Sequence, residues 1–556
     1  MNDLDILERC TVLVVGGGPG GSYTAAVLAR EGIDVVVLEG DTFPRYHIGE
    51  SMLASMRHLL RFVELDSKFD AYGFTKKPGA AFKLNRHKRE GYTDFLAAGG
   101  PDNYAWNVVR SEADHLMFQH AGESGAKIFD GVQVLSLQFE SPNLATEGEP
   151  NLNPGRPVAA TYLIKGSGVK GTINFDYIVD ASGRVGLLST KYMRNRRYNQ
   201  GLKNVAMWAY WTGCGRYAPG TARENSPYFE ALQDESGWAW FIPLHNGTTS
   251  VGVVMNQKLV SEKKKKIPSS GTSAFYHQTL QLAPNLLALM GPDAKLSPDA
   301  QVKSASDYSY SASSYALPYA RIVGDAGCFI DPYFSSGVHL ALVSGLSAAT
   351  TICASIRGDT DEPAAAEWHS TKVADAYTRF LLVVLSAYKQ IRHQDEPVLS
   401  DFGEDNFDRA FGFFRPVIQG VADASVIDNQ PAAAKNGGNN MKPSQEELNK
   451  TLEFCAHAFE PLNGLGEEAK AVVEGVLEGE KGGKGYDGVG FHPDLSPEQL
   501  RAVKHIRARR MMRTEDTLNL DSFGTDTIGS LVPNMVRGSL GLKKQLVDGN
   551  GDRSAV

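Results

Sequence analysis

Cysteine is scarce in this chain of 556 residues, and the five cysteines are scattered along it. Cys10, Cys214, Cys328, Cys353 and Cys455 show no paired spacing, which excludes a disulfide framework and a cysteine-type zinc site. Histidine, aspartate and glutamate form no cluster with metal-ligand spacing, so we expect no bound metal. This cysteine usage is typical of a reducing compartment, and we predict a cytoplasmic protein.

An excess of basic charge and a long hydrophobic run are also lacking. Lysine and arginine number 56 against 64 acidic residues, a formal net charge of −8. Such a surface repels phosphate, so we expect no nucleic-acid partner. The opening MNDLDILERC is too polar for a signal or transit peptide, and the apolar stretch at 380–385 is too short to span a bilayer. We therefore expect no membrane contact, and the size favours an enzyme.

A glycine-rich turn near the start predicts a dinucleotide site. The apolar run at 10–15 is typical of a buried strand, and it leads into the G-x-G-x-x-G spacing of Gly16, Gly18 and Gly21. The first glycine would make the tight turn, the second would admit a pyrophosphate, and the third would let helix and strand pack closely. A helix ending at Gly32 and a second strand at 34–38 complete a βαβ unit.

Acidic residues at strand ends point to the bound nucleotide. Glu39 ends the second strand and would accept the ribose hydroxyls. Asp325 follows a predicted strand at 320–323, where its carboxylate could hold the ribityl hydroxyls of a flavin. The segment 331–337 then opens a long helix near Val338, and its backbone N–H groups would form an anion site.

Changes in the residue pattern along the chain predict its domain organisation. We expect a dinucleotide-binding part over 1–200, an antiparallel-sheet substrate region over 201–300, a second dinucleotide-binding part over 301–360, and a helical C-terminal region over 361–556. Low-complexity stretches near 429–443 and 479–490 are typical of linkers.

Three motifs together resemble the flavin-dependent halogenases, most closely the fungal enzymes that halogenate phenolic polyketides of the resorcylic lactone or orcinol type. They are RYHIGES at 45–51, WAWFIP at 238–243 and DPYFSSG at 331–337. The resemblance runs from about residue 10 to beyond 420. It implies an α/β fold with Rossmann-like FAD binding, of the glutathione-reductase and p-hydroxybenzoate-hydroxylase type. It also implies the chemistry: reduced FAD and oxygen convert chloride or bromide to hypohalous acid, which a lysine guides to an electron-rich phenolic ring.

The resemblance also implies roles for individual residues. Lys77 would be the guiding lysine, with its neighbour Lys76 as the competitor. In an extended segment the two point to opposite faces, and Pro78 favours that conformation. Backbone amides of Ser336 and Gly337 would bind the halide. The residues expected beside the cofactor are Arg45, Glu50, Ser51, Arg110, Pro332 and Val338.

Two tryptophans would separate the organic substrate from the flavin. On a strand, Trp238 and Trp240 point to the same face, so the stripe fits either a bulky core or the barrier that the resemblance implies. One position departs from the family. Phe334 stands where tryptophan halogenases carry a glutamate, which favours an activated phenol over an indole.

Other functions on this fold stay open at this point. No second G-x-G-x-x-G unit occurs, so we expect a separate flavin reductase to supply reduced FAD. An aromatic hydroxylase would need open access from substrate to flavin, which the two tryptophans argue against. An escort-type binding protein would need no cofactor, whereas the intact glycines, Glu39 and Asp325 favour one.

Overall fold

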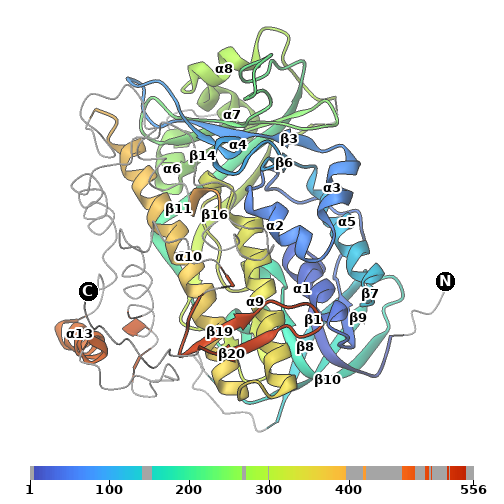
Figure 1. Ribbon diagram of the computed structural model, residues 1–556. Coiled ribbons are helices and arrows are strands. Elements are labelled where there is room, and N and C mark those ends of the chain that lie inside the picture. The colour runs from blue at the N-terminus through green and yellow to red at the C-terminus, as the bar shows by residue number, and fades with distance from the viewer. Residues whose placement is uncertain are drawn as a thin grey trace, which may run out of the picture.

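The computed structural model describes residues 6–140, 153–265, 271–298, 300–395, 417–420, 466–481 and 526–545, together with 495–496, 498–499, 503 and 523–524. Two large sheets organise these residues, and Figure 1 shows one in the lower and one in the upper part of the molecule. The predicted linker at 429–443 lies outside the described residues. The other stretch overlaps helix α13 (Glu467–Lys481), so its first three residues are helical rather than linker.

The lower sheet contains the predicted βαβ unit. Its parallel core has the order β18-β10-β1-β2-β7, and β17, β9 and β8 extend it by antiparallel pairing. The strands are β1 (Arg9–Val15), β2 (Val35–Leu38), β7 (Lys127–Phe129), β8 (Val132–Phe139), β9 (Pro157–Ile164), β10 (Lys170–Asp180), β17 (Ala316–Leu317) and β18 (Ala320–Ile322). Apolar residues fill β1 and β2 on both faces, as expected for central parallel strands.

Helix α1 (Pro19–Arg30) crosses from β1 to β2 and packs against α5 (Arg110–Glu123) and α9 (Gly337–Arg357). Pro19 occupies the first turn of α1, where a missing N–H costs no intrahelical bond. Among the described helices, α9 alone is long and apolar enough to cross a membrane, but 89% of its most apolar window is buried inside the protein. Burial of that kind is typical of a core helix.

The upper sheet differs from the prediction in extent. It has the order β15-β11-β14-β13-β12-β4-β5, and β16 also pairs with β11. The strands are β4 (Gly79–Lys83), β5 (Gly91–Asp94), β11 (Arg196–Thr212), β12 (Tyr228–Ala231), β13 (Gly237–Pro243), β14 (Thr249–Asn256), β15 (Lys295–Leu296) and β16 (Lys303–Ala312). The sheet is therefore not confined to 201–300. Strand β4 joins it through parallel pairing with β12, a contact between distant segments.

Helices cover one face of the upper sheet. They are α6 (Gln257–Lys265), α7 (Thr272–Leu280) and α8 (Pro284–Met290), and their apolar residues form a second core with the sheet. The opposite face belongs to the main core, which continues down to the lower sheet. The site described below lies between the two sheets.

The segments around this core are short helices, turns and one long helix. They are α2 (Ser55–Phe62), α3 (Asp66–Tyr72), α4 (Phe95–Gly99), α10 (Glu362–Arg392), the two-stranded pair β3 (Thr75–Lys77) and β6 (Ala105–Asn107), and the turns η1 (Gly183–Val185), η2 (Leu187–Tyr192), η3 (Gly324–Ala326) and η4 (Pro332–Phe334).

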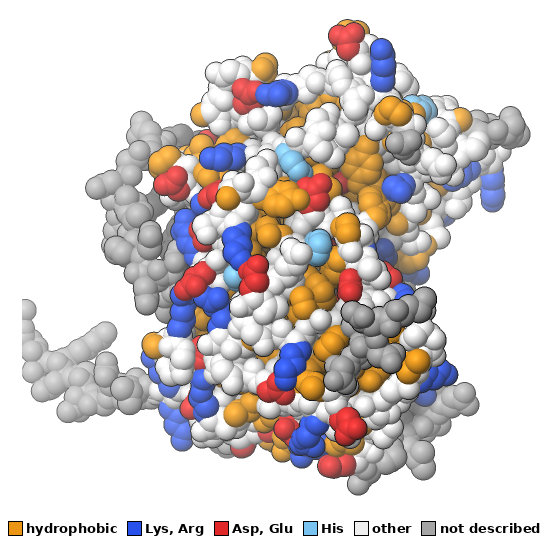
Figure 2. Space-filling view, turned by 90° about the vertical axis from the view of Figure 1, so that its right-hand side faces the viewer, with side chains coloured by type: hydrophobic (Ala, Val, Ile, Leu, Met, Phe, Trp, Pro, Cys, Tyr) orange, Lys and Arg blue, Asp and Glu red, His pale blue; other side chains and the backbone are white. Residues whose placement is uncertain are grey.

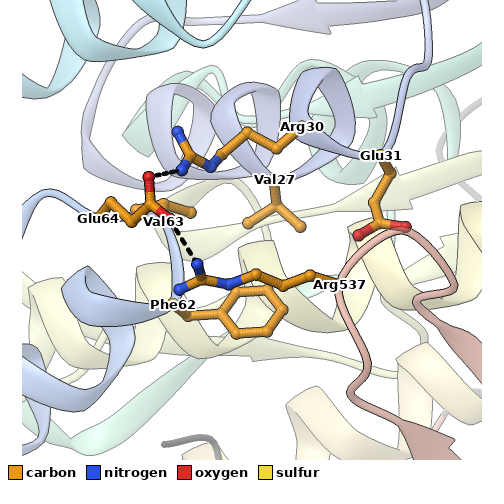
Figure 3. A pocket seen from close by; sticks show the side chains of 7 residues that line it. All are labelled: Val27, Arg30, Glu31, Phe62, Val63, Glu64 and Arg537. Atoms are coloured by element: carbon orange, nitrogen blue, oxygen red, sulfur yellow. Dashed lines mark hydrogen bonds and ion pairs between the residues drawn. The ribbon is translucent and has the colours of Figure 1, made fainter.

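The C-terminal region is not purely helical, because β19 (Leu531–Asn534) and β20 (Gly541–Lys544) form a hairpin beside α9 (Figure 1). Its loop docks on Glu31 at the end of α1, which accepts the N–H groups of Gly538 at 2.8 Å and Leu540 at 3.0 Å. Figure 3 shows the adjoining surface pocket, where Glu64 pairs with both Arg30 and Arg537. These contacts fasten the hairpin to the dinucleotide-binding part.

Candidate active site

The glycine-rich turn has the geometry that its spacing predicts. Gly16 has a φ of +103°, and a Cβ there would lie 2.2 Å from the carbonyl oxygen of Ala181. A Cβ at Gly21 would lie 1.9 Å from the carbonyl oxygen of Gly16, so α1 packs directly on the turn. A Cβ at Gly18 would meet only a guanidinium nitrogen of Arg45, at 3.3 Å. The backbone is thus open on the side where a pyrophosphate would approach.

Glu39 lies at the end of β2, next to this turn. Its carboxylate accepts the N–H of Gly17 at 2.6 Å and the N–H of Asp41 at 2.8 Å. A carboxylate has about four acceptor positions, so further hydrogen bonds to ribose hydroxyls remain available. The residue fits the nucleotide role that its position predicts.

The two predicted arginines converge on one carboxylate. Arg110 makes two hydrogen bonds with Asp114, at 2.8 and 3.0 Å, and Arg45 reaches the same group at 3.0 Å. Arg110 also donates to the backbone carbonyls of Ile48 and Gly49, at 2.9 and 3.1 Å. Arg110 therefore holds the 45–51 segment in place, and its contact with the cofactor stays a prediction.

Asp325 lies in η3, directly after β18, as predicted. Burial raises the pKa of its carboxyl to about 6, although Arg184, Arg110 and Arg196 act in the opposite direction. A polar ligand that donates hydrogen bonds to this carboxylate would offset the cost of its burial.

The 331–337 segment forms a tight turn into α9. Asp331 caps η4 by accepting the N–H of Tyr333 at 3.1 Å, and Ser335 adopts a left-handed conformation with a φ of +58°. The first N–H groups of a helix have no intrahelical partner. A Cβ at Gly337 would touch nothing within 4 Å, and the buried hydroxyl of Ser336 has no hydrogen-bond partner. The turn thus offers open space and free donors to an anion.

Lys76 and Lys77 point in opposite directions, as the extended segment predicts. Lys76 is exposed, and its ammonium lies 4.3 Å from the ring centroid of Tyr104. Lys77 is 1% exposed and donates to the hydroxyl of Ser51 at 2.8 Å and to the carbonyl of Met52 at 2.7 Å. Burial lowers the pKa of the Lys77 ammonium to about 7. Only Lys77 can serve an interior reaction.

The tryptophan strand β13 separates the two cores. Trp238 and Trp240 face the main core, whereas Ala239 and Phe241 face the helices of the upper sheet. The Trp238 ring meets the ring of Tyr333, in the turn before α9, edge to face at a centroid distance of 5.0 Å. The tryptophans therefore stand beside the turn that offers the anion site.

A family model for the FAD binding domain matches residues 9–374 of this chain. Over 541 residues the chain is 72% identical to the flavin-dependent halogenase ascD of Acremonium egyptiacum, and the alignment covers 97% of this chain and 93% of that protein. The chain belongs to the flavin-dependent halogenases.

Two further comparisons agree. This halogenase is 50% identical over 552 residues to the sulochrin halogenase gedL of Aspergillus terreus, covering 97% of this chain and 94% of that protein. The crystal structure of CmlS, a flavin-dependent halogenase, superposes with a TM-score of 0.61 at 28% identity, covering 73% of this chain and 68% of that chain. The predicted family, fold class, enzyme class and FAD requirement are confirmed. Halogenases of this kind need a supply of reduced flavin and an aromatic substrate.

Glu50 and Ser51 of the halogenase are neighbouring buried residues that bind different parts of the site. Glu50 is 3% exposed and accepts the Tyr210 hydroxyl at 2.6 Å, whereas its other carboxylate oxygen has no partner. Burial raises the pKa of Glu50 to about 7. The Ser51 hydroxyl, which binds Lys77, also accepts the hydroxyl of Ser335 at 3.0 Å. Pro332 and Val338 flank the same turn, at the start of η4 and in the first turn of α9.

Several residues of this site carry no signal in the sequence. Tyr388, on α10, bonds both Trp238 and Asp331, and Asn204 joins the same group. Tyr210, on β11, is the partner of Glu50. None of these residues belongs to a motif, and each reaches the site through contacts between distant segments. Only Asp331, which lies in the DPYFSSG motif at 331–337, gave a starting point for finding them.

The described part of the surface in Figure 2 shows basic and acidic side chains interspersed. No group of three or more histidine, cysteine, aspartate or glutamate residues with metal-binding geometry occurs among the described residues.

Proposed function

We propose that this halogenase chlorinates or brominates an electron-rich phenolic ring of a polyketide, with Lys77 guiding the oxidised halogen. The enzyme would act in the cytoplasm and receive reduced FAD from a separate reductase. The proposal rests above all on one observation, the burial of Lys77 without a carboxylate partner.

Two lysines are fully buried among the described residues, and they differ in their partners. Lys372 forms an ion pair with Asp526, which compensates for its burial. Lys77 has only the Ser51 hydroxyl and the Met52 carbonyl as hydrogen-bond partners in the described part of the chain. A lysine is almost never buried unpaired for stability alone. This arrangement supports a chemical role for Lys77.

The residues around the glycine turn fit FAD. Gly18 would face the pyrophosphate, Glu39 the ribose, and Asp325 the ribityl chain, with Val338 and Pro332 along the flavin. When bound, reduced FAD would supply two of the four electrons that reduce oxygen, and the halide would supply the other two, so that hypohalous acid and water form. The amides of Ser336 and Gly337 would hold that halide. They lie at the N-terminus of α9, and the positive dipole end of a helix attracts anions.

Lys77 could aim the oxidant in two ways. As a neutral amine it would attack hypohalous acid, so that a nitrogen–halogen bond forms, the oxygen–halogen bond breaks, and water leaves. As an ammonium it would hold hypohalous acid by a hydrogen bond. A pKa of about 7 populates both forms near neutral pH. In either case the ring carbon takes the halogen, the ring loses a proton, and the lysine is regenerated.

A phenolic substrate is supported by the environment of the anion turn. Phe334 is 2% exposed and packs against Phe82 at a ring-centroid distance of 5.3 Å, in the place of the glutamate of tryptophan halogenases. A phenol needs no carboxylate there, because its own hydroxyl pushes electrons into the ring. The sulochrin halogenase at 50% identity is a relative with a named substrate.

The test is mass spectrometry of products formed by purified protein with FAD, a flavin reductase, NADH, oxygen, bromide and a resorcinol-type phenol. We expect a product with the isotope doublet of bromine, lost in Lys77→Ala while FAD still binds. Lys76→Ala is the matched control and keeps activity, since that side chain is exposed. A product heavier by one oxygen instead would establish a hydroxylase.

The requirement for a separate reductase is tested by leaving the reductase out of the reaction. We expect NADH alone to leave bound FAD oxidised, and chemically reduced FAD to restore bromination without any second protein. Reduction of the flavin by NADH in the purified halogenase would contradict the two-component arrangement.

A further inference from the structure

The hydroxyl of Tyr388, on α10, lies at the centre of a buried hydrogen-bond network. It donates to a carboxylate oxygen of Asp331 at 2.6 Å. It accepts the indole N–H of Trp238 at 2.8 Å and the side-chain amide of Asn204 at 2.8 Å. A hydroxyl has one hydrogen to donate and two lone pairs. These three bonds use all of them.

The groups in this network are shielded from solvent. Trp238 and Tyr388 are 1% and 3% exposed, and Asn204 and Asp331 are fully buried. An unpaired indole N–H in such a place would lose a hydrogen bond without replacement by water. The tyrosine hydroxyl therefore fixes the position of the Trp238 ring.

Asp331 carries this link to the anion turn. One of its oxygens accepts from Tyr388 and from Asn204, the latter at 3.0 Å. The other accepts the N–H of Tyr333 and so caps η4. The turn ends in Ser335, which is held in a left-handed conformation. A single tyrosine thus connects a barrier tryptophan to the cap of the proposed halide turn.

Tyr388 also separates this network from the surface. Tyr388 and Gly237, the residue before Trp238 in β13, line a surface hollow together with Glu235, Ser236, Asn256, Leu259, Ile391 and Arg392. The guanidinium of Arg392 lies 5.1 Å from the centroid of the Tyr388 ring and covers it. Tyr388 therefore stands between solvent and the tryptophan barrier.

We propose that Tyr388 is a positioning residue that holds the Trp238 ring and the halide turn in one fixed arrangement. The inference rests on the proposed function for its catalytic consequence. When these hydrogen bonds are intact, the Trp238 ring stays in place and the backbone amides of Ser336 and Gly337 stay aligned for a halide. When they are broken, reduced FAD still reduces oxygen, but the peroxide-level oxygen is released as hydrogen peroxide instead of oxidising the halide.

The test compares Tyr388→Phe with a matched control elsewhere. Tyr276 also accepts an indole N–H, that of Trp211 at 3.0 Å, and donates to the carbonyl of Val251 at 2.8 Å, but it belongs to the second core. Tyr276→Phe therefore removes the same kind of hydroxyl far from the turn. Both variants keep their ring, so packing changes little.

Two measurements are made on each protein. Hydrogen–deuterium exchange of a peptide spanning 329–338 is followed without FAD, and hydrogen peroxide per halogenated product is measured in the complete reaction. We expect the peptide to exchange about fivefold faster in Tyr388→Phe, the effect of about one lost hydrogen bond, with wild-type exchange in Tyr276→Phe. Peroxide per product is expected to rise in Tyr388→Phe alone.

The outcomes separate the positioning role from the function itself. Unchanged exchange in Tyr388→Phe, or an equal increase in both variants, would overturn the inference. If wild-type protein makes no halogenated product, the proposed function fails, while the exchange result still decides whether Tyr388 holds the turn. If Tyr388→Phe does not fold, Trp238→Phe breaks the same link from its other end, and the same exchange criterion applies.

Discussion

Lys77 and Ser335 donate to the same oxygen. The Lys77 ammonium lies 2.8 Å and the Ser335 hydroxyl 3.0 Å from the hydroxyl oxygen of Ser51. Ser335 belongs to the turn that opens α9, so the Ser51 side chain connects Lys77 to this turn. Polar groups from three separate segments thus link the proposed guiding lysine to the proposed halide turn.

This contact makes Ser51 a determinant of the lysine's protonation. In Ser51→Ala the ammonium loses one of its two acceptors, and a hydrogen bond to a charged group favours the charged form. We expect the pKa of Lys77 to fall further, by about one unit. The pH dependence of amine modification at Lys77, followed by mass spectrometry, measures this. Ser335→Ala leaves the lysine contact intact and should shift the profile less; an equal shift in both variants would contradict the argument.

The buried lysine should also lower stability. Its folded-state pKa of about 7 lies below the ordinary value of 10.5, so the unfolded chain binds one more proton than the folded protein between these two pH values. Stability of the wild type should therefore rise as pH increases from about 7 toward 10. Lys77→Met removes this dependence and is expected to be more stable at pH 7 by an amount on the order of a few kcal/mol. Denaturation midpoints at pH 7 and pH 9.5 test it, with Lys76→Met as the exposed control. Parallel pH dependence in wild type and Lys77→Met would show that folding does not lower the pKa of Lys77.

The buried carboxyl of Glu50 should have the opposite effect on how stability depends on pH. Its folded-state pKa, about 7, lies above the ordinary value of 4.5, so the folded protein holds a proton that the unfolded chain releases. The stability this contributes is complete below about pH 4.5 and is lost as pH rises through 7. Glu50→Gln mimics the protonated form. Its stability relative to wild type should increase between pH 5 and pH 8 by about 2 to 3 kcal/mol. A constant difference at both pH values would refute this assignment.

Local features of the fold could be predicted from the sequence. The strand at 10–15, the helix that follows and the strand at 34–38 correspond to β1, α1 and β2 within one or two residues. Each is specified by residues close together in the sequence: apolar runs in the strands, a proline in the first turn of the helix, and glycines at the ends of these elements. The opposite orientation of Lys76 and Lys77 was also local, because it follows from the period of an extended chain.

Non-local features could not be predicted. Pairing of β4 with β12 joins Ala81 to Tyr228, and nothing in either strand specifies the other. The β19–β20 hairpin was missed because its short strands lie in a region read as helical. Tyr388 is one of 21 tyrosines, and only packing reveals that its hydroxyl meets Trp238. The part of the site that holds the barrier in place is therefore visible only in three dimensions.

Gly18 and Gly21 provide a test that separates cofactor binding from folding. A Cβ at Gly21 would lie 1.9 Å from the carbonyl oxygen of Gly16, so Gly21→Ala must displace α1 from β1 and should unfold or strongly destabilise the protein. Gly18 has a φ of −70°, which alanine adopts freely, and its Cβ would meet only the far end of the Arg45 side chain, at 3.3 Å. Gly18→Ala should therefore melt like the wild type. The added methyl group points to the open side of the turn, where the pyrophosphate would approach, so FAD affinity should fall about tenfold or more. Thermal melting by circular dichroism and titration with FAD measure the two effects. Wild-type FAD affinity in Gly18→Ala would place the pyrophosphate elsewhere than on this turn.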